Sequence, residues 1–95
     1  MTVEEFILNY KLQEHFVISV EGVEKRQGWQ RNFSSSDGIY HGLIIVNEDK
    51  SNFWFSIYKE WNGQELLNKI ISNRFEDFLP MIQMLEKKYI KLCQK

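Results

Sequence analysis

Two neighbouring segments carry apolar residues at both odd and even positions, and this pattern limits the fold more than any other feature. The first segment, 41–47, contains the four-residue apolar run Leu43 to Val46. The second segment, 53–61, follows after the polar loop 48–52. Short apolar runs bounded by polar loops are typical of buried strands. We expect the two segments to be strands joined by a hairpin loop, and apolar residues on both parities of 41–47 indicate that this strand has a central position in the sheet.

The N-terminal third predicts a helix followed by strands. Thr2 and Glu5 have the spacing of a capping box, which predicts a helix over residues 3–12. Residues 16–21 then alternate between apolar and mixed positions, which favours a strand ending near Gly22. Residues 28–34 also alternate, and we interpret them as a further strand.

The Asn62-Gly63 pair leaves two interpretations of the segment that follows. Asn-Gly between apolar runs is a strong hairpin signal. However, Leu66, Leu67, Ile70 and Ile71 recur at i, i+1, i+4 and i+5, which is the spacing of a helix stripe. We therefore predict a helix over residues 64–72, with the hairpin as the alternative.

Pro80 divides the C-terminal region. Proline is tolerated in a first helical turn, and Asp77 is a suitable N-cap shortly before it. We therefore predict a separate last helix from about residue 77, in which Ile82, Leu85, Tyr89 and Leu92 form the buried stripe. The alternative is one helix over residues 64–93, kinked at Pro80.

These elements predict one α+β domain over residues 1–95 with two layers. An antiparallel sheet of three to four strands would carry the N-terminal helix and two C-terminal helices on one face. The order would be helix, three or four strands, helix, helix.

Composition restricts the class of function. Lys plus Arg is 12 and Asp plus Glu is 13, a net charge of -1, which lacks the positive excess of a nucleic-acid or membrane-surface binder. No secretory signal pattern or membrane-spanning apolar stretch is present, and Cys93 is the only cysteine. We therefore expect a cytoplasmic protein without disulfides.

Residue types that carry chemistry are scattered. His15 and His41 lie far apart in sequence, and each lacks a second ligand at helix or strand spacing. Paired carboxylates occur only where a helix start or a loop explains them, and no phosphate-loop, dinucleotide or hydrolase motif occurs. We expect no catalytic residue, no metal site and no cofactor, hence a protein that is not an enzyme.

The segment 25–33 mixes cations with aromatic residues. Lys25, Arg26, Trp29 and Arg31 have the composition of a nucleic-acid contact, in which bases stack on rings and cations meet phosphates. Three cations provide little electrostatic attraction, so we favour a structural edge or a protein contact. In that interpretation the contact residues are Trp29, Arg31 and Phe33.

The strand at 53–58 carries the main functional hypothesis. Its odd positions should face the core, which leaves Trp54 and Tyr58 together on the opposite face. Exposed aromatic residues mark binding sites and dominate contact energies. We predict a small non-catalytic binding or regulatory protein that binds a protein partner or a second copy of itself. Inhibitor, immunity-type and phage-related roles all belong to this class. The alternatives are nucleic-acid contact through 25–33, and a ligand-binding protein or enzyme with a pocket between helices and sheet.

Overall fold

A computed structural model describes residues 1–89 of the chain. The sequence-based expectations for Leu92 and Cys93 lie outside these residues. The elements, in order, are α1 (Val3–Asn9), β1 (Gln13–Ile18), β2 (Glu24–Ser34), β3 (Tyr40–Asn47), β4 (Phe53–Glu60), β5 (Gln64–Ser72) and α2 (Phe75–Lys88).

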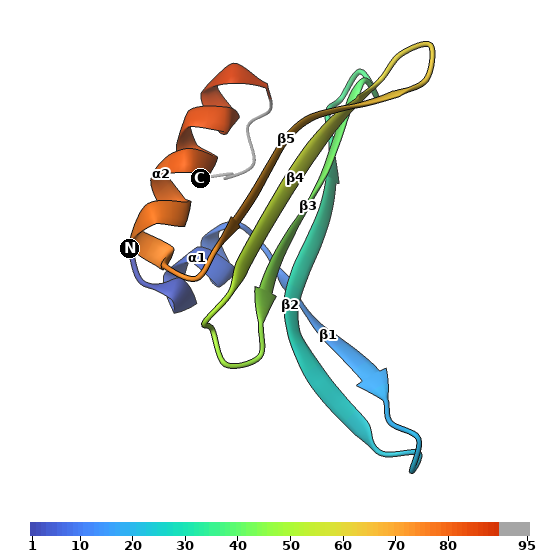
Figure 1. Cartoon of the computed structure of the whole chain (residues 1–95), viewed down its shortest axis with the longest axis vertical. Helices are drawn as coiled ribbons and strands as arrows, with labels where there is room; N and C mark the ends of the chain where they lie inside the picture. Colours follow the sequence, from blue (N-terminus) through green and yellow to red (C-terminus); the bar gives the residue numbers. More distant parts are fainter. Residues whose placement is uncertain (90–95) are drawn as a thin grey trace.

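The five strands form one antiparallel sheet in the order β1-β2-β3-β4-β5, and both helices lie on the same side of it (Figure 1). This confirms the antiparallel sheet with an N-terminal helix, but the sheet has five strands where three or four were predicted, because residues 64–72 add β5, and β3 lies at its centre. The capping box is also confirmed: the Thr2 hydroxyl accepts from the Glu5 N–H, and the Glu5 carboxylate accepts from the Thr2 N–H.

The core lies between the helices and the sheet face that they cover, called here the inner face. The odd residues of β4 point into it as predicted, since Phe53, Phe55 and Ile57 are at most 2% exposed. The helices meet these strands through aromatic rings: the centroids of Phe53 and Phe78 lie 5.3 Å apart. The other buried core residues are Phe6, Tyr10, Leu12, Phe33, Ile44, Val46, Ile70, Ile82 and Leu85.

The predicted helix over residues 64–72 is wrong, because this segment is strand β5. Asn62 and Gly63 adopt positive φ angles of 57° and 118° and turn the chain back, which is the hairpin alternative. The helix-like spacing arises because each apolar pair divides between the two sheet faces. Ile70 is buried on the inner face, while its neighbour Ile71 is on the outer face and 62% exposed.

A bulge completes this pattern within β5. Leu66 pairs with Tyr58 and Asn68 pairs with Ile57, so Leu67 has no opposite residue. The side chain of Leu67 packs against the core instead. The extra residue shifts the alternation, so Leu66 faces outward although Ile70, also at an even position, faces the core.

The C-terminal region of the described chain contains one helix rather than two. Helix α2 begins after Arg74, so the predicted N-cap at Asp77 is wrong. Pro80 is the sixth residue of α2 and lies beyond the first turn, on the exposed side. It cannot donate a hydrogen bond to the Glu76 carbonyl, but the packing of Phe78 and the other buried residues holds the helix on the sheet.

The first two strands form a longer hairpin than predicted. β1 begins at Gln13 rather than Phe16, and β2 begins at Glu24 rather than residue 28. The hairpin extends beyond the rest of the sheet (Figure 1). The charged segment at the start of β2 gives no alternating apolar signal, because in this extension neither face is buried.

Candidate functional site

The sheet face opposite the helices, called here the outer face, carries a patch of apolar side chains. Cross-strand pairing fixes its membership, because residues directly opposite one another share a face. One row joins Ile45, Trp54 and Ile71, and a second row joins His41, Tyr58 and Leu66. Between them lie Leu43, Ser56 and Lys69. The apolar outer patch is defined as Leu43, Ile45, Trp54, Tyr58, Leu66 and Ile71.

The side chains of this patch are open to solvent to different degrees. Leu66 and Ile71, on the edge strand β5, are 61% and 62% exposed. Trp54 and Tyr58 are half-buried by their neighbours on the same face. Trp54 and Tyr58 therefore lie on the face opposite the core, as predicted, with the row of Leu43, Ser56 and Lys69 between them.

Trp54 lies beneath a cation. The Lys69 Nζ atom is 4.6 Å from the centroid of the indole ring, within the range of a cation–π interaction. The indole Nε1 atom is shielded from solvent and finds no acceptor among residues 1–89.

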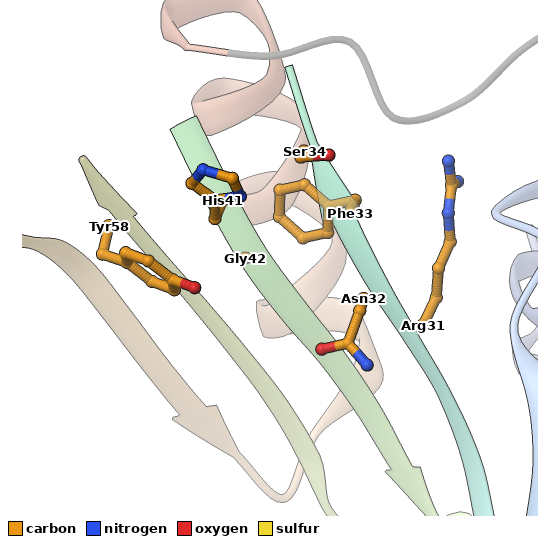
Figure 2. A pocket seen from close by; sticks show the side chains of 7 residues that line it. All are labelled: Arg31, Asn32, Phe33, Ser34, His41, Gly42 and Tyr58. Carbon is orange, nitrogen blue, oxygen red and sulfur yellow. The ribbon is translucent and has the colours of Figure 1, made fainter. Parts of the chain in front are cut away.

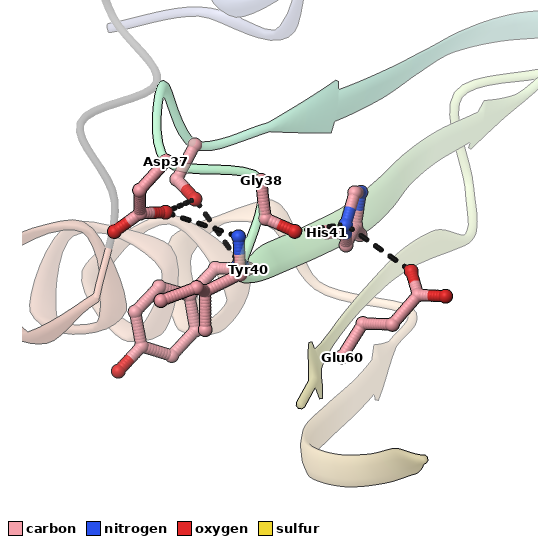
Figure 3. A network of polar contacts seen from close by, with 7 residues as sticks. Asp37, Gly38, Tyr40, His41 and Glu60 are labelled. Atoms are coloured by element: carbon pink, nitrogen blue, oxygen red, sulfur yellow. Dashed lines mark hydrogen bonds and ion pairs between the residues drawn. The ribbon is translucent and has the colours of Figure 1, made fainter. Parts of the chain in front are cut away.

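Tyr58 stacks on His41, which belongs to a polar network at one end of the sheet (Figure 3). The two ring centroids are 5.5 Å apart with an interplanar angle of 22°. His41 Nε2 lies 2.8 Å from the Gly38 carbonyl oxygen and 3.3 Å from the Glu60 carboxylate. The network orders the β2–β3 loop, where the Ser35 hydroxyl donates to Asp37 and holds the pKa of that carboxyl below its usual range.

A shallow hollow of about 410 Å³ opens beside these rings (Figure 2). The Phe33 ring fills the space that a side chain at Gly42 would take, since an added Cβ would lie 2.1 Å from the Phe33 Cζ atom. The hollow has no carboxylate in its lining, and it lacks the apolar enclosure of a typical small-molecule site. Its lining residues are Arg31, Asn32, Phe33, Ser34, His41, Gly42 and Tyr58.

The basic-aromatic segment of β2 is largely engaged within the molecule. Arg26 donates two hydrogen bonds to the Glu48 carboxylate, at 2.8 and 3.2 Å, and lies 3.7 Å from Glu14. The hydrogen-bonded guanidinium holds the pKa of Glu48 below its usual range. The Arg26 Cζ and Lys50 Nζ atoms lie 4.6 and 5.3 Å from the centroid of the Trp29 ring. The Trp29 ring therefore already makes cation–π contacts within the protein.

The two remaining sequence-predicted contact residues of β2 also support the fold. Arg31 donates to the Tyr10 carbonyl at 2.9 Å and so ties β2 to the end of α1. Phe33 is 7% exposed and stacks on Phe55 at a centroid distance of 5.6 Å. Lys25 is exposed on the extended hairpin and lies apart from the outer patch.

Sequence reasoning missed four members of the outer patch. The helix interpretation of residues 64–72 hides the position of Ile71 beside Trp54 and of Leu66 beside Tyr58. Leu43 and Ile45 were expected to be covered on both faces. The Asn62-Gly63 turn was the signal that could have placed β5 next to β4.

Comparisons with known proteins leave the site to be interpreted from its chemistry. No protein family, curated protein or solved structure matches this chain. Within residues 1–89, no group of three or more metal-ligating side chains occurs. None of the helices in the same part of the chain is long and apolar enough to cross a membrane.

Proposed function

We propose that this protein is a small non-catalytic binding protein that docks a partner protein on the outer face of its sheet. The observation that carries the proposal is the apolar outer patch, which lies on the face that neither helix covers (Figure 1). A contiguous exposed apolar surface on a small soluble domain costs solubility and usually marks an interaction site.

The arrangement of the patch matches the anatomy of a protein interface. A half-buried tryptophan and tyrosine lie at its centre, where hot spots concentrate, and a strand edge with exposed aliphatic residues borders them. Lys69 is the one charged side chain within its three rows. The fitting partner is an apolar protein surface with a carboxylate that meets Lys69 when the lysine leaves the Trp54 ring.

The nucleic-acid and enzyme alternatives receive less support. Arg26 and Trp29 are engaged with Glu48 and with neighbouring cations, so base stacking on Trp29 would first require displacing those contacts. The hollow beside Tyr58 is open and lacks a carboxylate. We therefore assign the protein no catalysis and, from its sequence features, a cytoplasmic regulatory role in which binding itself inhibits or neutralises the partner.

A matched pair of lysine substitutions tests the proposal. Ile71→Lys changes the outer patch, whereas Met84→Lys changes an equally exposed residue of α2, at 62% and 60% exposure respectively. Each variant is immobilised and compared with wild type in affinity capture from native lysate. We expect Met84→Lys to retain the wild-type partner and Ile71→Lys to lose most of it. Retention by both variants, or no partner on wild type, would contradict the proposal.

A further inference from the structure

The two edges of the sheet are protected very differently. β5 carries Lys69 and the bulge at Leu67, and α2 packs along it, which are established means of preventing pairing with another strand. β1 has none of these within Gln13–Ile18: it contains neither Lys nor Pro, and all six residues are exposed. The register irregularity of this hairpin lies in β2, opposite His15 and Phe16.

The exposed edge strand is also apolar. Phe16, Val17 and Ile18 are consecutive and are 44%, 39% and 76% exposed. Because successive side chains alternate, this triplet presents apolar groups on both faces of the hairpin. Val20, at the tip, is 100% exposed.

Hydrogen bonding at the hairpin turn determines which main-chain groups of β1 are directed outward. The Ser19 N–H donates to the Val23 carbonyl at 2.9 Å, so Ser19 bonds toward β2. In an antiparallel pair this orientation alternates along the strand. The main-chain N–H and C=O groups of Ile18, Phe16 and Glu14 therefore point to the open edge.

We propose that β1 pairs antiparallel with β1 of a second copy of this chain, about a twofold axis at Phe16, joining the two sheets into one. In this register Phe16 lies opposite Phe16, and Glu14 lies opposite Ile18, so all three outward-directed residues form hydrogen-bonded pairs.

Charge and apolar matching favour a second copy as the occupant. The twofold register sets Glu14 opposite an apolar residue and His15 opposite Val17, so no like charges face each other. It also sets the exposed Phe16 side chains of the two copies opposite each other. The contact is isologous, and therefore closes as a dimer.

The oligomeric state tests the pairing through two matched variants. Ile18→Lys places a charge on the edge, and Leu8→Lys changes a residue of α1 with the same 76% exposure. By sedimentation at micromolar concentration we expect wild type and Leu8→Lys to be dimers and Ile18→Lys to be a monomer with an unchanged circular dichroism spectrum. A monomeric wild type at millimolar concentration, or a dimeric Ile18→Lys, would overturn the proposal.

Cross-linking tests the register in a Cys93→Ser background. Phe16→Cys places the two thiols across the axis, whereas two Val20→Cys thiols would be separated by eight residues of strand, about 27 Å. A short bismaleimide should join Phe16→Cys copies and leave Val20→Cys copies unjoined. Equal or preferential joining of Val20→Cys would overturn the register. Ile18 lies outside the outer patch. The Ile18→Lys variant should therefore still bind the captured partner although it no longer dimerises.

Discussion

Replacing Phe55 with alanine should lower the free energy of unfolding by about 3–5 kcal/mol, the range found when a buried aromatic site is emptied. Phe55 is fully buried, stacks on Phe33 and lies between Ile44 and Ile70 in the inner-face row. A loss of this size is a large part of the total stability of a small domain. Urea denaturation followed by circular dichroism measures this loss.

Trp54→Ala is the matched control one residue away on the same strand. Trp54 points to the outer face, where it contacts neighbouring side chains but no covering element. We expect its removal to cost less than about 1 kcal/mol, in the range of cross-strand pairs and surface substitutions. Equal losses for Trp54→Ala and Phe55→Ala would show that both faces of β4 are covered.

Gly28→Ala should destabilise the protein by about 3–5 kcal/mol, from overpacking and backbone strain together. Gly28 has a φ of 146°, and an added Cβ would lie 2.1 Å from the Val46 carbonyl oxygen and 2.9 Å from the Asn47 Cα. Both contacts are with backbone, which cannot move without disturbing the β2–β3 ladder. Urea denaturation measures the loss.

Gly22→Ala separates the steric contribution from the φ angle. Gly22 also has a positive φ, 79°, but its Cβ would meet nothing within 4 Å. We expect a cost of about 1–2 kcal/mol, that of the left-handed conformation alone. If the two variants are equally destabilised, the close approach of β2 to β3 at Gly28 does not limit the fold.

The sequence was most informative where burial is one-sided and local signals agree. The odd and even residues of β4 differ in burial as their alternation predicts, and the Thr2–Glu5 capping box starts α1. In both places a short-range pattern determines the outcome, without knowledge of what the segment packs against.

Segment 64–72 shows why periodicity alone fails. Leu66 and Ile71 are apolar although they lie on the outer face, so the segment does not show the one-sided alternation that identifies a strand. The same surplus of apolar residues that misled the prediction forms the edge of the outer patch. The outer-face side chains that form the proposed binding surface therefore also remove the alternation by which a strand is recognised in sequence.

Only some of the candidate contact residues could be placed from the sequence, because the position of the others depends on long-range packing. Trp54 and Tyr58 lie on the predicted face because strand parity determines their position. The sequence predicts Phe33 and Arg31 as contact residues, but their roles depend on α1 and on core residues distant in sequence. No local pattern reveals that the helices cover their face of β2.

The affinity of the captured partner for wild type and Trp54→Ala, measured by calorimetry, tests the central claim most directly. If the outer face docks the partner, Trp54→Ala should raise the dissociation constant by about 30-fold or more, equivalent to about 2 kcal/mol of binding free energy. The reason is that the substitution removes the central aromatic side chain of the patch. The free variant should remain folded, with its unfolding free energy within about 1 kcal/mol of wild type. A dissociation constant within about threefold of wild type for the folded variant would contradict the assignment of the outer face as the binding surface.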